Sequence, residues 1–458
     1  MIRFRKRGLG GFTTTRIIAL GFLGTILVGT LLLMLPISSA AGVVTEPVDA
    51  LFTSTTSVCV TGLVTVPTYS YWSVFGQIVI ALLAQIGGLG VITFTMMFLI
   101  ALHKRIGLRE RLLIQDAYNL DTIQGMVVLV KKVIKGTLII EGIGALLYMT
   151  VLIPEFGALG IWKSIFNSIS AFCNAGMDVI GPSSLEPYVA NPVMNITTML
   201  LIILGGIGFP VWWNIVDLFR YKKMKYPDWS MALRHLRLHT KLVLVTTAAL
   251  ILIGTLAVFL LEYTNPDTIG NLPLWQKIQA SFFQSVTTRT AGFATISQAG
   301  LHKATAFICC LLMFIGGSPS GTAGGVKTTT VVILFVTVWS IIRGRKETEI
   351  FGRKISDNIV RRALAIFMVS FVVVLVVVTA LAAVQPGNFM DCLYETISAI
   401  ATVGLTRDFT AGLNVAGRLI IIVTMYIGRI GPISLALFFN SKRYVNLKSY
   451  PEEKVSVG

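Results

Sequence analysis

The segment FTSTTSVCVTGLVT, from Phe52 to Thr65, consists mainly of hydroxyl-bearing and small apolar residues and lies between two long apolar stretches. It carries no formal charge. It is too short to cross a bilayer, because a spanning helix needs about 20 residues. Gly62 lies near its end, among residues that do not favour a continued helix. Irregular backbone of this kind is tolerated at membrane depth only where protein buries it or where it lines water.

The composition indicates an all-α polytopic membrane protein. Hydrophobic residues make up 54% of the 458 residues, charged residues make up only 13%, and the mean hydropathy is +0.79. A soluble chain would carry about 25% charged residues. Apolar runs of about 20 residues recur, long enough to span ~30 Å of hydrocarbon. The alternating pattern of an outer-membrane barrel is absent from the sequence.

The net charge of +17 is confined to a few places. Because basic residues collect on the cytoplasmic side of membrane proteins, we expect these clusters and both termini in the cytoplasm of a cell-membrane protein. Anionic lipid headgroups are sufficient partners for the charge, and nucleic acid is not expected. The five clusters span residues 3–16, 104–135, 220–241, 343–362 and 442–454. The five cysteines form no CxxC pair, which favours buried free thiols over a metal site.

Between successive basic clusters the chain repeats one pattern, in which an apolar helix leaves the cytoplasm, a short amphipathic segment follows, and a second apolar helix returns. The sequence thus predicts four tandem helix–re-entrant pore helix–helix (M1–P–M2) repeats with eight transmembrane spans around a pseudo-fourfold pore. The expected repeats are 1–102, 103–221, 222–343 and 344–458. The expected outgoing helices are 17–36, 126–153, 242–261 and 363–384, and the returning helices are 74–102, 193–219, 303–342 and 415–440.

Two landmarks recur in register in these repeats. The short segments FTSTTSVCVTG, FNSISAFCNAG, FFQSVTTRTAG and YETISAIATVG each end on a glycine. An aromatic residue stands ten positions before it and a small or polar residue eight before it. The aligned aromatics are Phe52, Phe166, Phe282 and Tyr394, and the polar residues are Ser54, Ser168, Gln284 and Thr396. The second landmark lies on the returning helix and reads QIGGLG, ILGGIG, FIGGSP and YIGRIG in the four repeats. Its first glycines are Gly87, Gly205, Gly316 and Gly428.

Four such segments meeting on one axis would form an ion filter. The C-terminus of each short helix would direct partial negative charge into a central cavity. The residues after the helix can aim backbone carbonyls at the axis and replace an ion's hydration shell, and glycine permits the positive φ that this geometry needs. The expected filter residues are Val60, Thr61, Gly62, Asn174, Ala175, Gly176, Thr290, Ala291, Gly292, Thr402, Val403 and Gly404.

With TTSVCVTGL, VTTRTAGF, ATVGLT and YIGRIGPIS, the chain resembles the Trk, Ktr and HKT superfamily of potassium-translocating subunits over essentially its whole length. Its length and termini favour the bacterial Ktr type. The resemblance implies potassium uptake, and glycine at all four anchor positions implies preference for potassium over sodium. It also implies a homodimer docked on a separate cytoplasmic nucleotide-binding regulatory subunit of RCK/KTN type. No cofactor is expected in this chain, and sodium is a candidate activator or co-ion.

The resemblance also implies a gate below the filter. Arg429 replaces the second glycine of the fourth landmark, and the family's matching arginine limits permeation from within the pore; the alternative is an arginine that braces helix ends. The segment GGSPSGTAGGVKTTT, residues 316–330, cannot form a stable helix interior and corresponds to the family's intramembrane loop; the alternative is a static kink. The expected gate residues are Arg429, Gly316, Gly317, Ser318, Ser320, Gly321, Thr322, Ala323, Gly324, Gly325 and Lys327.

Several weaker signals complete the sequence predictions. A nucleotide-binding P-loop is rejected because Val326 precedes Lys327. His235 and His239 have helical spacing but lie in a basic loop, so a solvated stretch is favoured over a metal site. Arg289 is expected to anchor the third filter segment or an acidic neighbour. Acidic residues either concentrate cations at the outer mouth or belong to ordinary solvated loops; they are Glu46, Asp49, Asp178, Glu186 and Asp408.

Two other function classes remain as alternatives. A rocking secondary carrier would bind its substrate near the bilayer midplane and show saturable, occluded transport. A membrane-embedded enzyme would need a cluster of His, Asp, Glu or Cys at one depth, and the sequence has none. We therefore expect no covalent chemistry.

Overall fold

The protein is described by a computed structural model that covers residues 14–101, 107, 126–224, 234 and 236–431. Nearly all of its regular structure is helical. Within these described residues, four helices are each long and apolar enough to cross a membrane. They correspond to the four predicted outgoing helices, with ends shifted by a few residues. These are α1 (Thr14–Met34), α7 (Met126–Phe156), α12 (Leu238–Glu262) and α16 (Asp357–Val384).

A shorter helix follows each long one and coincides with one of the four aligned segments. Most of the residues in these short helices are buried, although many of them are Ser and Thr. The four helices are α2 (Pro47–Cys59), α8 (Leu159–Cys173), α13 (Leu274–Thr287) and α17 (Phe389–Ala401). Each of these short helices contacts the long helix that precedes it, so none of them is isolated from the bundle.

Two returning helices that were predicted to be continuous, 74–102 and 193–219, are broken. The break falls at the last glycine of the GGxG landmark, where Gly90 has a φ of +85° and Gly208 has a φ of +92°. Only glycine adopts such angles readily, so the helix stops there. The first pair is α4 (Val74–Leu89) and α5 (Val91–Ala101), and the second is α9 (Pro192–Gly206) and α10 (Phe209–Met224), which is bent by 100°.

The other two returning segments also end their helices within the landmark. Pro319 occupies the matching position of the third landmark, and there a loop separates α14 (Lys303–Phe314) from α15 (Thr328–Ile342). Gly431, with a φ of +91°, ends α18 (Val415–Ile430). The predicted continuation of this helix to residue 440 lies outside the described residues. Side chains also set three of the helix starts, because Ser73 accepts from the Gly76 N–H, Asn191 from the Met194 N–H and Asn414 from the Gly417 N–H.

Small elements connect the helices. The strands β1 (Glu349–Ile350) and β2 (Arg353–Lys354) form an antiparallel hairpin between α15 and α16. One short helix, α3 (Thr68–Tyr71), and three 3₁₀ turns lie in the connections on the side of the molecule opposite the hairpin. These turns are η2 (Pro36–Ser38), η3 (Glu186–Tyr188) and η4 (Thr410–Gly412).

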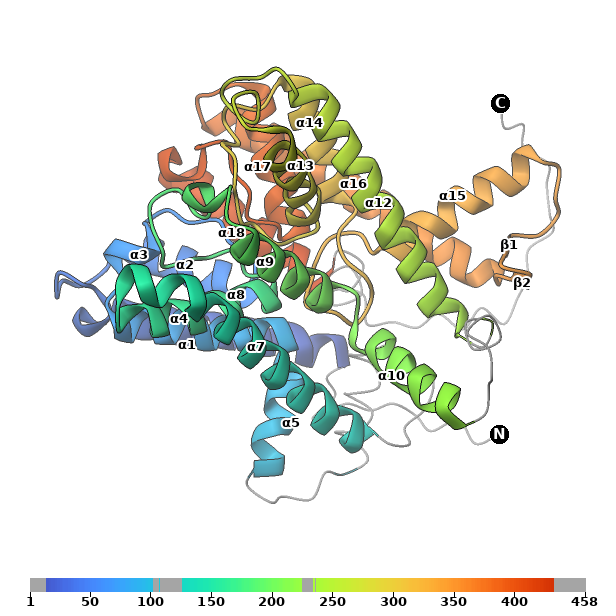
Figure 1. Cartoon of the computed structure of the whole chain (residues 1–458), viewed down its shortest axis with the longest axis horizontal. Helices are drawn as coiled ribbons and strands as arrows, with labels where there is room; N and C mark the ends of the chain where they lie inside the picture. The colour runs from blue at the N-terminus through green and yellow to red at the C-terminus, as the bar shows by residue number, and fades with distance from the viewer. Residues whose placement is uncertain (1–13, 102–106, 108–125, 225–233, 235, 432–458) are drawn as a thin grey trace.

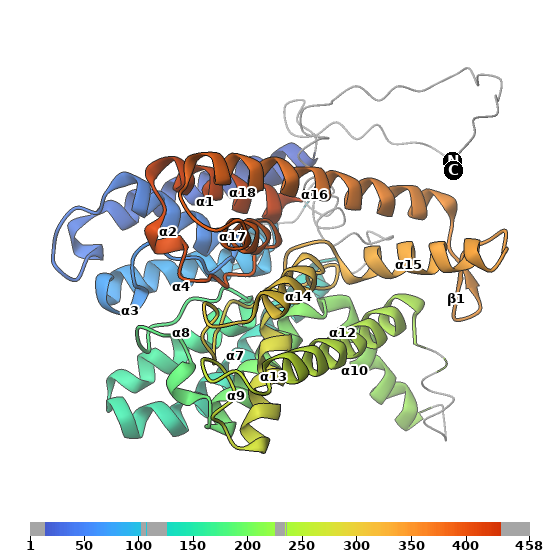
Figure 2. The same ribbon diagram turned by 90° about the horizontal axis from the view of Figure 1, so that it is seen from above.

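The helices form a closed ring around one centre. Along the ring, α4 contacts α8, α9 contacts α13, and α14 contacts α17. The last described helix, α18, returns to the first group and packs on α2, and the Tyr426 hydroxyl donates to the Ala19 carbonyl at 2.8 Å. Figure 1 and Figure 2 show this arrangement, with the blue, green, yellow and orange-to-red parts of the chain in adjacent sectors.

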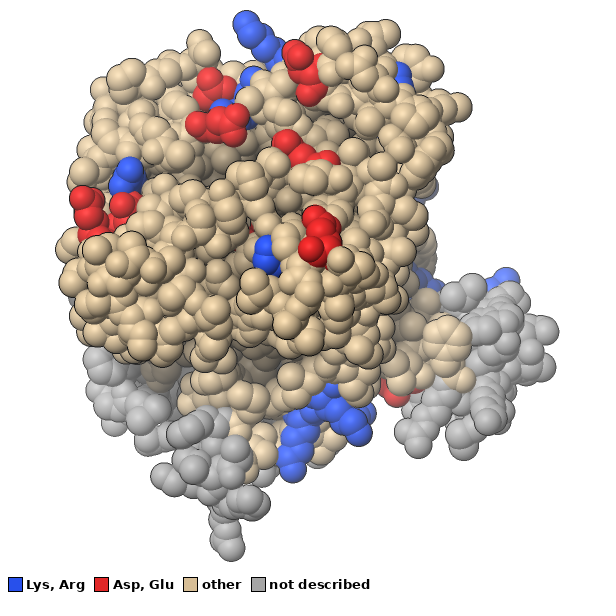
Figure 3. Space-filling view, turned by 60° about the vertical axis from the view of Figure 1, so that its left-hand side comes forward, with Lys and Arg blue, Asp and Glu red and all other residues tan. Residues whose placement is uncertain are grey.

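The outer surface has the character of a membrane protein. Large apolar side chains project from the long helices, such as Leu31 at 66% exposed and Leu146 at 64%. Figure 3 shows a face dominated by uncharged residues, with most of the acidic residues towards its upper part. Such a surface is stable in hydrocarbon, where exposed apolar groups carry no cost.

Candidate functional site

The four anchor glycines lie next to one another at the centre of the ring. All have positive φ, at +98° for Gly62, +66° for Gly176, +82° for Gly292 and +96° for Gly404. A Cβ added to any one of them would collide with the backbone of the next segment. These contacts follow the chain order around the ring. A Cβ on Gly62 would meet the Ala175 carbonyl oxygen, and one on Gly176 would meet that of Ala291. A Cβ on Gly292 would meet the Val403 carbonyl oxygen, and one on Gly404 would meet that of Thr61. The structure thus brings all four predicted filter segments together.

A second residue in each segment also has left-handed backbone. Val60, Asn174, Thr290 and Thr402, two positions before the glycines, have φ angles of +57°, +59°, +66° and +53°. The sequence interpretation assigned positive φ to the glycines alone. Side-chain residues in this region cost about 1–2 kcal/mol each. Four strained residues at one site indicate that the surrounding structure fixes this backbone, as is common at functional sites.

In three of these segments a side-chain hydroxyl accepts a hydrogen bond from the backbone N–H of the anchor glycine or of the residue after it. The Thr56 hydroxyl accepts from the Gly62 N–H at 2.9 Å, and the Ser398 hydroxyl accepts from the Gly404 N–H at 3.0 Å. In the second segment, the Ser170 hydroxyl accepts from the Met177 N–H at 3.1 Å. All three hydroxyls stand six positions before the glycine. These bonds occupy the N–H groups, which leaves the segments' carbonyls available for another partner.

The third segment has a different register, which corrects the sequence alignment. Its hydroxyl is Thr287, only five positions before Gly292, and it donates to the Phe293 carbonyl at 2.6 Å. Likewise Ser285, rather than Gln284, matches Ser54 and Ser168, because all three donate to carbonyls of their long helices at 2.6–2.8 Å. The buried aromatic is therefore Phe283, at 0% exposed, and not Phe282.

The physical reason for the shift is that the backbone hydrogen bond closing this turn spans one residue fewer than in the other segments. In the other three segments an N–H bonds back five residues, as from Thr61 to the Thr56 carbonyl at 2.8 Å. In the third, the Ala291 N–H bonds back only four residues, to the Thr287 carbonyl at 3.0 Å. One residue fewer therefore separates the aligned serine from the glycine in this segment.

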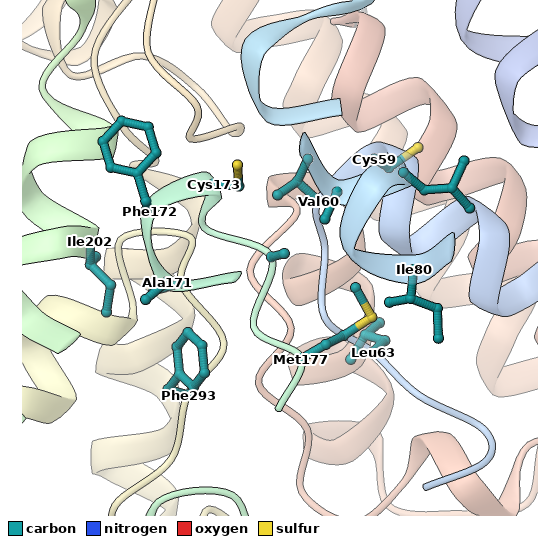
Figure 4. Close-up of a cluster of buried hydrophobic side chains, with 14 of the residues drawn as sticks. Cys59, Val60, Leu63, Ile80, Ala171, Phe172, Cys173, Met177, Ile202 and Phe293 are labelled. Atoms are coloured by element: carbon teal, nitrogen blue, oxygen red, sulfur yellow. The ribbon is translucent and has the colours of Figure 1, made fainter. Parts of the chain in front are cut away.

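Apolar side chains pack around the filter segments. Figure 4 shows Cys59, Val60 and Leu63 on one side and Ala171, Phe172 and Cys173 on the other, with Met177 beside Leu63. These residues belong to the largest buried cluster of the described chain. All five cysteines are buried, as expected. Because protein interiors are close-packed, this cluster resists changes in the spacing of the segments.

On one side of the ring, which the sequence predicts to be the outer side, the four glycines line a cavity of about 470 Å³. Three of the five acidic residues singled out in the sequence, Asp178, Glu186 and Asp408, line it. Burial, followed by the neighbouring charge of Asp408, raises the pKa of Glu186 above its ordinary value. Such a mouth attracts cations when its carboxyl groups are ionised.

The other two acids do not line this cavity. Asp49 is ion-paired with Arg418 at 2.6 Å and accepts from the Thr65 hydroxyl at 2.8 Å, which ties the first filter segment to α18. Glu46 is the exposed residue that precedes α2. A comparable tie fixes the fourth segment, because Arg407 pairs with Asp391 at 2.9 Å.

Glu186→Gln gives a prediction about external pH. As the pH falls through the raised pKa of Glu186, the carboxylate takes up a proton and the mouth loses negative charge, so cation uptake from dilute solution should fall. Glu186→Gln should lower uptake about two- to threefold near neutral pH, on the order of the effect of one mouth charge, and flatten this pH response. Uptake measured against external pH checks this, with the exposed Glu46→Gln as control. An unchanged pH profile in Glu186→Gln would show that this carboxyl does not face the permeating ion.

Beneath the glycines lies the predicted gate loop. Its ends pair with each other, since the Gly316 N–H donates to the Val326 carbonyl at 3.0 Å. The Thr322 N–H donates to the Gly205 carbonyl at 3.1 Å, and its hydroxyl donates to the Phe172 carbonyl at 3.2 Å. The loop therefore lies against the ends of α8 and α9. It contains Gly316, Gly317, Ser318, Ser320, Gly321, Thr322, Ala323, Gly324, Gly325 and Lys327.

Two positively charged side chains lie at the level of the gate loop. Arg429 donates from Nη1 to the Thr322 carbonyl at 2.5 Å and from Nη2 to the Gly87 carbonyl. Lys327 donates to the Ala323 carbonyl at 2.7 Å and to the Gly324 carbonyl at 3.3 Å. Arg429 therefore has the contacts of a brace between the loop and α4, and its charge lies directly below the filter segments, so both interpretations of this residue stay open.

Two weaker predictions have different outcomes. Arg289 is buried beside the filter, but its Nη1 atom has no hydrogen-bond partner within the described chain, so an acidic anchor is not found there. His235 lies outside the described residues. Within the described ranges no three His, Cys, Asp or Glu side chains gather in a way that could hold a metal ion.

Known proteins resemble this chain over nearly its full length. Residues 15–447 match the family model of the TrkH cation transport proteins. The Ktr system potassium uptake protein B of Bacillus subtilis (strain 168) is 42% identical over 98% of this chain and 97% of that protein. The potassium/sodium uptake protein NtpJ of Enterococcus hirae is 38% identical over 100% of this chain and 99% of that protein.

The fold also matches a solved structure. The potassium transporter TrkH of Vibrio parahaemolyticus superposes with a TM-score of 0.73 at 16% identity, covering 95% of this chain and 86% of that one. A ring of helices around four glycine-ended segments, in a largely apolar molecule, defines a membrane transport protein. The chain belongs to the TrkH family of cation transport proteins, which confirms the family expected from the sequence.

Proposed function

We propose that the protein is a channel-like potassium uptake subunit of the cell membrane. Relatives with more than a third of their residues identical are named potassium or potassium/sodium uptake proteins. The observation that carries the proposal is the contact of each anchor glycine with the backbone of the next segment around the ring. Carbonyls arranged in this way replace the water around a cation of suitable size. The membrane potential then drives uptake, at about 2.3 kcal/mol per charge per 100 mV.

In this proposal the chain has four repeats, 1–102, 103–221, 222–343 and 344–458, with eight spans in all. The recurring contacts support it. Landmark glycines Gly87, Gly205 and Gly428 each lie against a carbonyl four positions before an anchor glycine, at Val58, Phe172 and Ile400. The filter then consists of the last three residues of each short segment, and both termini lie in the cytoplasm.

The subunit works with partners. By analogy with relatives named as parts of a Ktr system, we propose a homodimer docked on a separate cytoplasmic RCK/KTN-type ring that binds nucleotide. Sodium acts as activator or co-ion, which the name of the NtpJ relative also suggests. A secondary carrier is the alternative, and saturating, occluded transport would favour it.

The direct test is complementation. Cells that lack potassium uptake should grow at low potassium when they express this chain with a suitable regulatory subunit, and adding sodium shows whether sodium is required. A matched strain carrying Gly62→Ser controls for expression. No growth in the wild type, with the protein present in the membrane, would refute potassium uptake.

Deleting residues 320–325 gives a prediction about the gate loop. Because Thr322 joins the loop to both Phe172 and Arg429, its loss should open the path below the filter and raise potassium flux several-fold. Flux into proteoliposomes measures this. The control deletes Phe351 and Gly352 from the exposed β1–β2 turn. If the loop-deletion variant is well folded and its potassium flux is no higher than that of the control, the loop is a passive connection.

A further inference from the structure

A groove separates α5 from the first half of α7, away from the candidate ion path. Its volume is about 460 Å³, and its walls are almost entirely apolar. Met97 and Ile100 line it from α5, and Leu138 and Ile139 line it from α7. Leu138 is 62% exposed and Ile139 is 50% exposed. Figure 1 shows α5 leaving the bundle below α7.

Two lysines, Lys131 and Lys135, stand at one end of this apolar wall. They are one helical turn apart, so their ammonium groups project from the same face of α7. Neither forms a salt bridge or hydrogen bond within the described part of the chain. Their neighbour Lys132, on another face, lies 5.2 Å from the centre of the Trp213 ring. The groove thus combines an apolar wall with two positively charged side chains that have no partner among the described residues.

The position of the lysines along α7 matches a membrane surface. The opposite end of α7, at Phe156, leads into α8 on the side of the outer mouth. At 1.5 Å per residue, Lys135 lies roughly 30 Å from Phe156, which is about the thickness of the hydrocarbon core. The ammonium groups therefore reach the headgroup level of the other leaflet, while Leu138 and Ile139 face acyl chains.

We propose that this groove binds an anionic glycerophospholipid of that leaflet. Its phosphate pairs with Lys131 and Lys135, and an acyl chain covers the apolar wall of α5 and α7. A free phosphate would leave the apolar wall uncovered, and a zwitterionic lipid would bring no net negative charge to the two lysines. Headgroup attraction contributes about 1 kcal/mol per basic residue near an anionic surface.

The site connects to the ion path through α4. The helix α5 continues α4 beyond the break at Gly90, and the Gly87 carbonyl of α4 accepts a bond from Arg429. A lipid that holds α5 against α7 fixes the position of this segment beneath the pore. Anionic lipid should then alter potassium flux, a consequence that rests on the proposed function, whereas lipid binding itself does not.

The experiment compares wild type with the double variant Lys131→Gln, Lys135→Gln. The control double variant Arg361→Gln, Arg362→Gln removes the same charge from two exposed residues at the start of α16. Native mass spectrometry in detergent, with added phosphatidylglycerol or phosphatidylcholine, measures bound lipid. We expect wild type and control to retain phosphatidylglycerol. The lysine variant should retain at least about fivefold less phosphatidylglycerol than wild type. Phosphatidylcholine should bind weakly to all three.

Flux assays form the second arm. Proteoliposomes with and without phosphatidylglycerol should show a lipid effect on potassium flux in wild type and control that is absent from the lysine variant. Equal phosphatidylglycerol retention in all three proteins would overturn the proposal. So would a groove that stays lipid-free and is covered by a second copy of the chain, seen as crosslinks between Ile139→Cys residues of two subunits. Lipid binding without any potassium flux would count against the proposed function alone.

Discussion

Replacing Gly62 by Ser should lower potassium uptake at least about tenfold and reduce the preference for potassium over sodium. The added Cβ would lie 2.7 Å from the Ala175 oxygen and 3.0 Å from the Gly176 Cα, in a backbone with a φ of +98°. Strain of about 1–2 kcal/mol from the positive φ, with displacement of two filter segments, accounts for a change of this size. Competition of sodium with potassium uptake measures the selectivity.

A matched control separates backbone strain from filter geometry. Gly42 also has positive φ, at +69°, but nothing lies within 4 Å of an added Cβ. Gly42→Ser should therefore leave ion preference unchanged. If Gly62→Ser and Gly42→Ser behaved alike, Gly62 would not form part of the filter.

Replacing Arg429 by Ala should raise potassium flux, by about tenfold. This corresponds to about 1.4 kcal/mol of lost barrier. The change removes a positive charge below the filter and releases both Thr322 and Gly87. Single-turnover or conductance measurements in proteoliposomes of matched protein content give the effect. A fall in flux with intact folding would assign Arg429 to bracing alone.

If Arg429→Ala raises flux, Arg429→Lys distinguishes the effect of the charge from that of the hydrogen bonds to the gate loop. It keeps the positive charge but cannot reproduce two donors held in the planar geometry of guanidinium. If electrostatic repulsion limits permeation, Arg429→Lys should resemble wild type. If the bonds to the loop limit it, Arg429→Lys should show the raised flux of Arg429→Ala.

The fold was largely predictable, because apolar length and repeated landmarks leave a strong signal. The four long helices and the four short segments lie where the sequence indicated. The breaks at Gly90 and Gly208 were missed, although the last glycine of each GGxG landmark was visible. Glycine is common in packed membrane helices, so the sequence alone does not show which glycine takes positive φ.

The site was less predictable in detail. Alignment on Gly292 placed Gln284 opposite Ser54, but the hydrogen-bonded turn before Gly292 is one residue shorter, and Ser285 takes that role. A register shift of one residue is invisible when Ser, Thr and aromatic residues stand side by side, as in FFQSVTT. The left-handed backbone of Val60 was likewise unexpected, because tertiary contacts, not local preference, hold a β-branched residue there.

In the proposed function, carbonyls beside Gly62, Gly176, Gly292 and Gly404 bind the permeating ion. Anomalous diffraction from crystals in which rubidium replaces potassium tests it most directly. The account predicts a rubidium peak on the axis between the four glycines, lost in Gly62→Ser and retained in Gly42→Ser. Rubidium bound only away from this axis, in a protein that still transports potassium, would contradict it.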